Sequence, residues 1–525
     1  MLIPTPKQLG LPDRYQTWRP HQDRAILDGL ECKKRFAVQV QRQGRGKTLT
    51  YMTQMLLSKG KRVVVLTSNK ALQDQALEEW SAFGLVDIRG KSSYDCDGYP
   101  GYKCEHGSVA KCIYKGSAMC GHYSAVSAAQ STDRLITNYS CWIASHKYGK
   151  GFGTFDVMIC DEAHSAAGEV AKAMQVQISE REVSDLMECS WPEKGLRDDL
   201  EAWKHWAKVH FTLAEQRLQR LKIEIEKQDK PRTSDIKDLQ AYNSLTRKLA
   251  DISTCKVKDW VVDEWMHGYQ FDPIDPSPAS DRLLFLGIPK VILTSGSIRP
   301  STLTKNGIAK GDYEFFEYPS DSDPARSPVM HLHTGVKVNR NVQPFELKRL
   351  VRYIDRVIES RSDRKGIIHT ASFKLRDFIW QHTAFQKQMH TNFRNGPPTS
   401  EVIAKFKADK NPGAILISPS ITTGVDFPYD ACRYQIVAKM PYQDMSSKVT
   451  RARMELNKDH LGEEMMQTFA QIIGRGDRAD DDFQEVFVLD DCYEYAMWRY
   501  ADYAPVWLPS MCREISEIPP APELP

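Results

Sequence analysis

The chain has 525 residues, a net charge of +3, an apolar content of 41% and a mean hydropathy of -0.49. A chain of this length exceeds what one hydrophobic core can organise, so about two to four domains are expected. The apolar content excludes an intrinsically disordered protein, and the balanced charge excludes a basic field over the whole molecule. Any nucleic-acid site must therefore come from local placement of Lys and Arg.

The N-terminus and the apolar segments indicate the compartment. The first residues lack the basic region and apolar core of a secretory signal, and no stretch of about 18 apolar residues occurs. We expect a protein of the cytoplasm, or of the nucleus in a eukaryote, and neither a secreted nor a membrane protein. In such a reducing compartment the 12 cysteines are expected to stay free or to bind metal, and not to form disulfides.

Short apolar runs, each followed by a turn or a helical segment, recur along the chain. Alternation of strands and helices is typical of parallel sheets covered on both faces. The runs fall into two sets, so two α/β domains are predicted. The first set is 35–40, 62–67, 155–160 and 290–295, and the second is 365–370, 413–418, 433–438 and 485–490. Between the sets, residues 318–328 are rich in Pro, Ser and Asp, as in an exposed linker.

The first run leads into QRQGRGKTLT, residues 41–50. A tight loop with glycines such as Gly44 and Gly46 lets backbone N–H groups surround phosphate oxygens. Lys47 would place a positive charge on the terminal phosphates, and the Thr48 hydroxyl would coordinate magnesium. The segment fits a Walker A loop, although Gln41 stands where the full pattern has Gly; a simple surface turn is the alternative.

Four cysteines follow at a strict eight-residue interval. They are Cys96, Cys104, Cys112 and Cys120. A window of 25 residues should contain about half a cysteine by chance, so the cluster needs an explanation. Zinc, an iron–sulfur cluster, disulfides and coincidence are the candidates, and the reducing compartment favours metal.

The sequence MICDEAH at 158–164 contains a second phosphate-associated motif. An apolar strand would deliver Asp161 and Glu162 to its carboxyl end, where phosphoryl transfer needs a magnesium ligand and a carboxylate that acts on the attacking water. We assign the first role to Asp161 and the second to Glu162. His164 would relay the nucleotide state to the rest of the protein.

Residues 180–256 have the periodicity of helices, with apolar side chains at steps of three and four. The segment 227–235 interrupts this pattern with a Pro and offers Ser234 or Asp235 as a helix N-cap. A helical hairpin is predicted. On the pattern alone it could equally be a bundle on the surface.

Near the C-terminus, QIIGRGDR at 471–478 resembles the Q-x-x-G-R-x-x-R motif that contributes arginine fingers. Negative charge that develops on a transferring phosphoryl group needs fixed positive charge, which a facing domain supplies when a cleft closes. Gln471, Arg475 and Arg478 are the candidates for this catalytic role. A basic helix face is the alternative.

In this order the motifs resemble those of superfamily 2 helicases. YQTWRPHQ at 15–22 is similar to the family's adenine-side motif, with Gln22 as the base contact. Residues 63–75 are similar to motif Ia, and LTSGSI at 293–298 to motif III. SITTGVDFP at 420–428 is similar to motif V, in which Gly424 and Asp426 would lie at the nucleotide.

Within that superfamily the chain resembles the XPD/DinG branch. This branch inserts a cysteine cluster between motif Ia and Walker B, and a helical arch between Walker B and motif III. The segment 120–142 resembles the branch's run from its last cysteine into a T-N pair that contacts DNA, here Thr137 and Asn138, and 439–444 resembles the segment after motif V. The resemblance implies an α/β fold of two RecA-like parallel-sheet domains, the first carrying both inserts.

The resemblance also implies the limits of the domains. Helicase domain 1 would comprise 1–90, 124–175 and 259–318 with the linker; the cysteine insert 91–123; the arch 176–258; and helicase domain 2 residues 319–525.

The family implies a [4Fe-4S] cluster on the four cysteines, since four thiolates can ligate one. Family members usually keep the two middle cysteines close in sequence, whereas seven residues separate each pair here. Four thiolates at this spacing would also satisfy tetrahedral zinc. Zinc and unmetallated thiols therefore stay open as alternatives.

The activity implied is that of an ATP-dependent DNA helicase with ATP and Mg²⁺ as cofactors, in a setting such as DNA repair or replication. ATP hydrolysed between the two domains would move a single strand, 5′ to 3′, and open forked duplex DNA. We expect a monomer and contacts mainly to phosphates. The residues expected along the DNA groove are Ser68, Asn69, Thr137, Asn138, Ser372 and Thr423.

Two other functions fit the same motifs. A translocase or remodeller would hydrolyse ATP on DNA or RNA without separating strands. A nucleotide-gated binding protein would use ATP only as a switch, which the presence of Glu162 disfavours.

Overall fold

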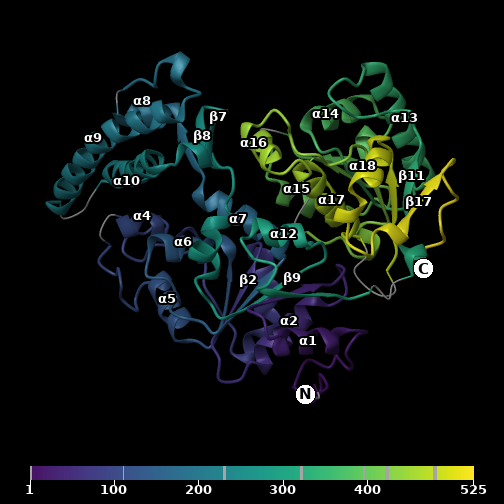
Figure 1. The fold of residues 1–525 in the computed structure, drawn as a ribbon, viewed down its shortest axis with the longest axis horizontal. Helices are drawn as coiled ribbons and strands as arrows, with labels where there is room; N and C mark the ends of the chain where they lie inside the picture. Colours follow the sequence, from purple (N-terminus) through teal and green to yellow (C-terminus); the bar gives the residue numbers. More distant parts are fainter. Residues whose placement is uncertain are drawn as a thin grey trace.

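The computed structural model describes residues 3–109, 112–187, 189–228, 232–319, 323–393, 396–419, 425–476 and 482–524. Within these residues the strands form two parallel sheets of seven strands and one antiparallel sheet of three. Figure 1 shows the two parallel-sheet domains side by side, the first in purple to teal and the second in green to yellow, with a helical arch above the first. The predicted fold class is confirmed.

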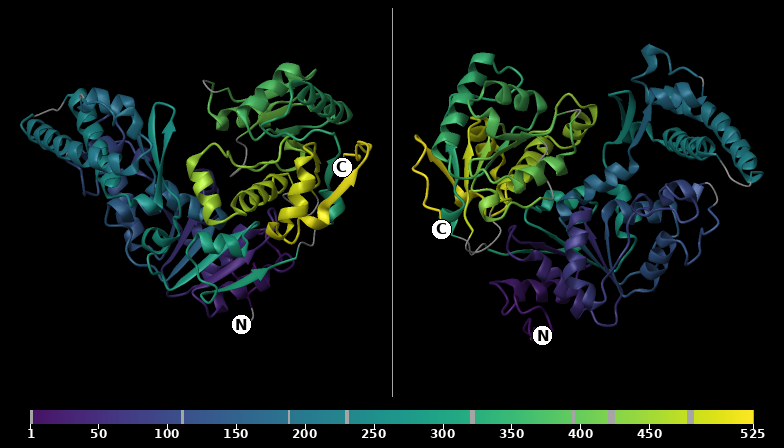
Figure 2. Two further views of the ribbon diagram at one scale, coloured as in Figure 1. Left: turned by 45° about the horizontal axis from the view of Figure 1, so that its top comes forward. Right: turned by 180° about the vertical axis from the view of Figure 1, so that it is seen from behind.

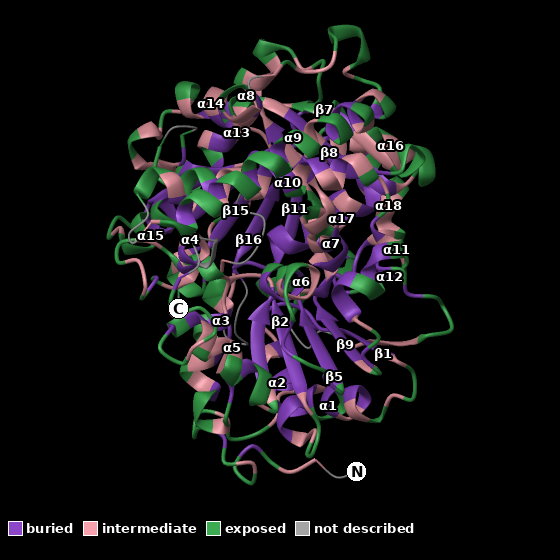
Figure 3. Ribbon diagram, turned by 90° about the vertical axis from the view of Figure 1, so that its left-hand side faces the viewer, coloured by how far each residue is buried: buried purple, intermediate pink, exposed green. Residues whose placement is uncertain are grey.

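The sheet of domain 1 has the strand order β10-β1-β9-β5-β2-β4-β3. Four of its five inner strands, β1, β9, β5 and β2, are the four apolar runs of the sequence, and almost all residues of these strands are buried (Figure 3). The other three are more polar or half-buried, so their sequences carry no strong strand signal. The bounds are β1 (Phe36–Val40), β2 (Val63–Thr67), β3 (Val86–Asp87), β4 (Arg134–Asn138), β5 (Val157–Asp161), β9 (Lys290–Ser295) and β10 (Tyr313–Glu317).

Helices cover both faces of this sheet, because alternate residues of each parallel strand point to opposite sides. On β1, Val38 belongs to the core that contains Trp142, and its neighbour Ala37 to the core that contains Trp80. The helices are α1 (Gln22–Glu31), α2 (Lys47–Leu57), α3 (Lys70–Trp80), α5 (Gly121–Ser131), α6 (Tyr139–Tyr148), α7 (Ala166–Met174), α11 (Ser277–Ser280) and α12 (Pro300–Lys305).

The sheet of domain 2 has the order β13-β14-β12-β15-β16-β11-β17. Four of its strands match the second set of apolar runs within two residues at each end. The strands are β11 (Val329–Leu332), β12 (Gly366–His369), β13 (Met389–Thr391), β14 (Ile415–Ser418), β15 (Tyr434–Val437), β16 (Glu485–Val488) and β17 (Cys512–Ile515). The helices are α13 (Pro344–Ser360), α14 (Phe373–His382), α15 (Thr399–Ala408), α16 (Lys448–Leu456), α17 (His460–Ile473) and α18 (Cys492–Tyr500).

The arch contains the predicted helical hairpin. It consists of α8 (Glu180–Met187), α9 (Leu200–Glu226) and α10 (Thr233–Thr254). The N-cap prediction was wrong: α10 begins at Thr233 after Arg232, because the Ser234 hydroxyl bonds to Asp235, and Asp235 itself accepts from Gln228. At the base of the arch lies a three-stranded sheet that the sequence analysis did not anticipate, of β6 (Val176–Ser179), β7 (Trp260–Trp265) and β8 (Gly268–Pro273).

Leu249 lies fully buried in the core of the arch, on α10. We expect Leu249→Ala to lower the stability of the arch by about 3 kcal/mol, because it removes buried methyl groups and leaves a cavity. Amide hydrogen exchange in α9 and α10 measures this change, with the exposed Lys237→Ala on the same helix as control. Unchanged protection in Leu249→Ala would contradict the packing described here.

The arch touches the cysteine insert on one side. In the insert, Asp95 pairs with Lys103 in an isolated antiparallel bridge that leads into α4 (Cys104–Val109). Helix α10 packs beside α4, and the Arg247 guanidinium lies over the Tyr148 ring at 5.4 Å. The arch is thus connected to domain 1 through the insert as well as through its own base.

The arch also touches domain 2, through α16. The backbone N–H of Lys448 donates to Asp263 over 3.0 Å, and its ammonium donates to the Val262 carbonyl over 2.9 Å. Arg453 donates to the carbonyl of Ile274 over 2.9 Å. The arch therefore bridges the two domains, and Figure 2 shows it beside domain 2 from two further directions. Among the helices of the described chain, none combines the length and hydropathy that a bilayer span requires.

Candidate nucleotide site and nucleic-acid interface

The predicted phosphate-binding loop connects the end of β1 to the start of α2. Gly44 and Gly46 have φ values of 78° and 74°, a region that L side chains rarely adopt. Gly46 directly precedes α2, so Lys47 and Thr48 form the first turn of that helix. A helix N-terminus after a glycine loop presents free N–H groups, which bind phosphate.

Two side chains from the start of the chain hold this loop. The buried Gln22 amide donates to the Gly46 carbonyl over 3.0 Å and accepts from the Arg19 N–H. The Arg19 guanidinium donates to the Gly44 carbonyl over 2.8 Å. Gln22 thus positions the loop in this structure, and its contact with an adenine base stays a prediction.

The two carboxylates of the predicted Walker B motif lie next to the loop. Lys47 Nζ is 2.8 Å from Glu162 Oε1, and Tyr51 donates to Asp161 over 3.3 Å. Glu162 has a φ of 47°, which is strained for a residue with a side chain, and it lies directly after β5. The structure therefore brings Lys47, Asp161 and Glu162 together as the sequence predicts.

The environment separates the pKa values of the two carboxyls. Burial, and then the neighbouring Glu162 carboxylate, raises the pKa of Asp161 to about 6. Although burial would also raise the pKa of Glu162, the Lys47 ammonium and then His164 hold it well below its ordinary value. Glu162 is therefore ionised at neutral pH, as a group that accepts a proton from water must be.

Two serines of the LTSGSI segment extend this network. Ser295 Oγ lies 3.2 Å from Glu162 Oε2 and 2.8 Å from His164 Nδ1. Gln471 Nε2 on α17 donates to Ser297 Oγ over 2.6 Å. The hydrogen bonds thus run from the phosphate loop through domain 1 into domain 2. The sequence analysis assigned no role to the two serines, although it identified the segment that contains them.

The other predicted residues of domain 2 are placed differently. Arg475 is buried and donates to the Val425 carbonyl over 2.6 Å, so its guanidinium binds the segment identified as motif V. Asp426 is exposed. Arg478, Gly424 and Thr423 lie outside the described residues. Arginine-finger chemistry at Arg475 stays a prediction.

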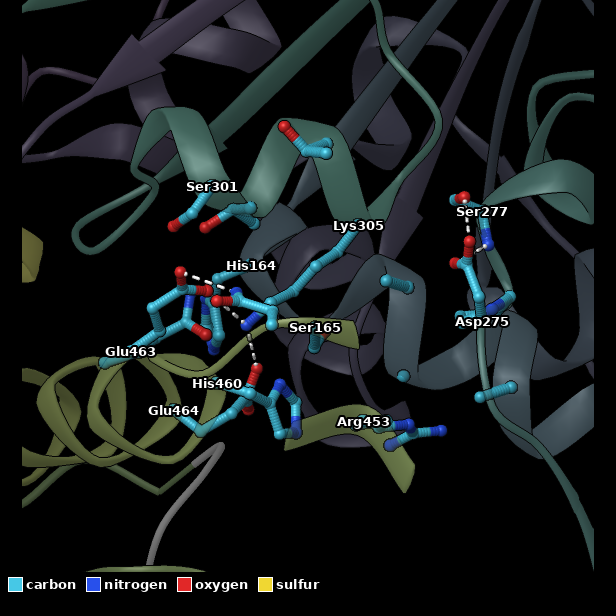
Figure 4. Close-up of a pocket in the computed structure, with 18 of the residues that line it drawn as sticks. His164, Ser165, Asp275, Ser277, Ser301, Lys305, Arg453, His460, Glu463 and Glu464 are labelled. Atoms are coloured by element: carbon cyan, nitrogen blue, oxygen red, sulfur yellow. Dashed lines mark hydrogen bonds and ion pairs between the residues drawn. The ribbon is translucent and has the colours of Figure 1, made fainter. Parts of the chain in front are cut away.

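Ser297 offers a test of the link between the domains. We expect Ser297→Ala to lower the rate of nucleic-acid-stimulated ATP hydrolysis by about tenfold, because it leaves the buried Gln471 amide without its acceptor. Steady-state kinetics measure the change. Ser301→Ala, at the edge of the cleft (Figure 4), is the matched control. A wild-type rate in Ser297→Ala would show that this contact does not matter for turnover.

A pocket of about 410 Å³ opens beside the phosphate loop. It is lined by Arg19, Arg42, Arg45 and Arg326, together with Tyr318. Four guanidinium groups around one pocket favour an anionic ligand, and an aromatic ring gives a planar base a surface to stack on. The pocket fits the base, ribose or phosphates of a nucleotide.

A second pocket of about 640 Å³ lies between the domains (Figure 4). Lys305 reaches from α12 to Glu463 and Glu464 on α17, at 3.0 and 2.6 Å. Although burial would lower the pKa of Lys305, Glu464 and then Glu463 raise it, so the pair stays charged. These contacts hold the domains together at a point next to His164, another lining residue of this pocket.

The predicted DNA-contacting residues lie where strands β2, β4 and β12 end. Asn69, Asn138 and Ser372 are N-caps of α3, α6 and α14, and each accepts a hydrogen bond from its own helix. Ser68 precedes Asn69, and Thr137 is fully buried and donates to the Ile88 carbonyl. Their observed roles are structural, yet a helix N-terminus offers N–H groups to which a phosphate backbone can bind. DNA contact by these residues stays a prediction.

The four predicted metal-ligand thiols are all buried. Cys96 Sγ and Cys112 Sγ lie 3.8 Å apart. Burial, and then the neighbouring Cys120, raises the pKa of Cys104 to about 12. Within the residues that the structure describes, no group of three or more His, Cys, Asp or Glu side chains is positioned to hold a metal ion. Cys96 thus approaches Cys112, and Cys104 approaches Cys120. The metal site stays a prediction.

The surroundings of the thiols nevertheless fit a thiolate-bound metal. The backbone N–H groups of Gly98 and Tyr99 hydrogen-bond to Cys96, as they do to sulfur ligands. A Cβ on Gly107 would clash with Cys96 Sγ, and one on Gly98 would clash with Cys112 Sγ. Two glycines thus leave room for the sulfur atoms.

Comparison with known proteins gives two matches to family models. Residues 357–511 match the helicase C-terminal domain, and residues 16–187 match the family described as "Type III restriction enzyme, res subunit". No curated protein matches the chain in sequence.

Three solved structures share the fold. The one titled "XPD_Helicase" has a TM-score of 0.65 at 14% identity, over 94% of this chain and 98% of the other. The one titled "XPD_APO" has a TM-score of 0.62 at 14% identity, over 95% and 100%. "Structure of S. tokodaii Xpd4" has 0.59 at 12%, over 95% and 100%. The match at 357–511 thus identifies a helicase C-terminal domain in the second parallel-sheet domain, and the chain as a whole shares the fold of these solved structures.

Proposed function

We propose that the protein is an ATP-dependent DNA helicase that moves 5′ to 3′ on a single strand and opens forked duplexes. The observation that carries this proposal is the continuous set of contacts from Lys47 through Glu162 and Ser295, and from Ser297 to Gln471. These contacts connect a phosphate-binding loop to a second domain. A motor needs such a connection, because hydrolysis must move one domain against the other.

The residues of the cleft have separate tasks in hydrolysis. ATP binding would draw Lys47 from Glu162 onto the terminal phosphates, and the freed carboxylate would then accept a proton from the attacking water. Asp161 and Thr48 fit a magnesium ion, because a buried carboxylate and a hydroxyl at the loop are oxygen ligands. Bound Mg²⁺ would neutralise charge on the phosphates. Gln471 already contacts Ser297 of domain 1, and the arginines of 471–478 would approach the phosphates from domain 2 as the cleft closes.

The nucleic acid would bind along the helix N-termini at Asn69, Asn138 and Ser372, the first two in domain 1 and the third in domain 2. Backbone contacts of this kind are salt-sensitive and nearly independent of sequence. Each ATP cycle would change the distance between the helix N-termini of domain 1 and that of domain 2, and would so advance the strand. The arch and the cysteine insert would surround the strand at the fork, since the arch contacts both the insert and domain 2.

We infer a metal centre at the four cysteines of the insert. The family resemblance implies a [4Fe-4S] cluster. The separation of 3.8 Å between Cys96 and Cys112 equals that of two thiolates at about 2.3 Å from one tetrahedral zinc, about 3.8 Å. Iron, sulfide and zinc content of protein purified without oxygen decides between the two.

A translocase that hydrolyses ATP on DNA or RNA without separating strands is the second candidate, because the same contacts would serve it. The test compares ATP hydrolysis on single-stranded DNA and RNA, and then strand release from duplexes with a 5′ or a 3′ tail. Stimulation by DNA and release only from the 5′-tailed duplex support the proposal. Stimulated hydrolysis without strand release from either duplex favours the translocase.

A further inference from the structure

Gln43, in the phosphate loop, makes an unusual contact with both domains. Its side chain is only 3% exposed and lies between Gly296 of domain 1 and Gly474 of domain 2. A Cβ on Gly474 would lie 2.7 Å from Gln43 Oε1, and a Cβ on Gly296 would clash with the same carboxamide. The side chain is therefore enclosed from both sides.

Backbone conformation does not explain the two glycines. Neither Gly296 nor Gly474 has a positive φ, so alanine would suit the backbone at both positions. An alanine methyl group at either position would instead overlap the space that the Gln43 carboxamide fills. The glycines thus provide room for this one side chain.

The carboxamide itself is unsatisfied. Among the described residues neither Oε1 nor Nε2 of Gln43 has a hydrogen-bond partner. A buried amide without partners costs free energy, and such groups are rare in folded proteins unless a ligand satisfies them. The neighbouring groups indicate which ligand: Gly296 lies between Ser295, which contacts Glu162, and Ser297, which contacts Gln471.

The preceding loop residue, Arg42, also faces domain 2. Arg42 lies over the Trp507 ring at 5.3 Å, and Trp507 Nε1 donates to the Gly296 carbonyl over 3.0 Å. The part of the loop at 42–43 is thus directed across the cleft, whereas Lys47 is directed at Glu162 of domain 1.

We propose that Gln43 is a positioning residue through which domain 2 senses the terminal phosphate of ATP. When ATP is bound, Nε2 donates to a terminal phosphate oxygen while the carboxamide stays against Gly474. ADP lacks that phosphate, so the contact distinguishes the two nucleotides. The inference rests on the proposed function for its consequence in turnover, and its binding step can be measured without turnover.

The first experiment measures the affinity of the full-length protein for a non-hydrolysable ATP analogue and for ADP. Gln43→Ala is expected to weaken binding of the analogue by about tenfold, with the affinity for ADP changed less than about twofold. Gln43→Glu, which has the same shape with a negative charge, is expected to weaken the analogue more. Equal losses for both nucleotides, or an analogue affinity unchanged in Gln43→Glu, would overturn the proposal.

The second experiment tests the contact across the cleft by combining two substitutions. Gly474→Ala is expected to lower kcat by about tenfold, with KM for ATP within about threefold, because the new methyl group displaces the carboxamide. In Gln43→Ala/Gly474→Ala the rate should return to that of Gln43→Ala, a non-additive result. Additive losses would contradict the contact. Gly311→Ala, where a Cβ meets open space, is the control.

The two experiments separate the inference from the proposed function. In one outcome the wild-type protein hydrolyses no ATP on any nucleic acid, while Gln43→Ala still weakens binding of the ATP analogue more than binding of ADP. That result refutes the proposed function and retains the role of Gln43. A wild-type protein that binds neither nucleotide refutes both.

Discussion

Lys47→Ala is expected to reduce ATP hydrolysis by about a thousandfold or more, because it removes the lysine expected to bind the terminal phosphates and leaves the half-buried Glu162 carboxylate without its ammonium partner. Lys47 Nζ is 2.8 Å from Glu162, and its side chain is 9% exposed. Steady-state hydrolysis with saturating single-stranded DNA measures the effect.

Lys59→Ala provides the matched control for this prediction. Lys59 is exposed just after the same helix and far from its N-terminus. Its substitution should leave hydrolysis within about twofold, as expected for exposed sites. Hydrolysis by Lys47→Ala at a similar level would mean that the loop does not bind the reacting phosphates.

Cys104→Ser is expected to lose strand separation by about a hundredfold while it retains much of the basal ATP hydrolysis. The reason is location. Cys104 is buried in an insert that contacts the arch, and the insert lies outside the contacts between Lys47 and Gln471. Strand displacement and ATP turnover are measured on the same preparation, together with its metal content.

The control for this substitution is Cys189→Ser, a half-buried cysteine of the arch. It should keep both activities and the full metal content. Equal loss of hydrolysis and strand separation in Cys104→Ser would mean that the insert is needed for folding, and not specifically for opening the fork.

Most strands that are buried on both faces could be predicted from sequence, although β4 and β11 were missed. The apolar runs at 62–67 and 290–295 differ from β2 and β9 by at most one residue. Edge strands could not be predicted, because β10 is only half-buried and β17 has exposed polar residues. The sheet at the base of the arch was missed as well, since β6 and β8 pair although about 90 residues, including the arch helices, separate them in sequence.

Individual residues of the candidate nucleotide site could be predicted from sequence, whereas the contacts between them could not. Short motifs identified Lys47, Asp161 and Glu162, because phosphate chemistry restricts those positions strongly. Ser297 and Gln43 could not be identified in the same way. Their roles depend on contacts between residues more than 170 positions apart, which no local pattern records.

For the four cysteines, sequence predicts the grouping but not the pairing or the metal. Their even spacing predicted that they belong together, and the structure buries all four within one insert. The pairing of Cys96 with Cys112 depends on how the insert folds, and sequence spacing alone does not define it. Thiolates bind both zinc and iron, so the cysteine pattern alone does not define which metal would bind.

Strand displacement from a 5′-tailed duplex tests the central claim most directly. The duplex is incubated with the wild-type protein with and without ATP, and with Lys47→Ala and ATP. The account predicts strand release only by the wild-type protein with ATP, and none from the matching 3′-tailed duplex. Release without ATP, or equal release by Lys47→Ala, would contradict the claim that ATP hydrolysis between the two domains drives strand separation.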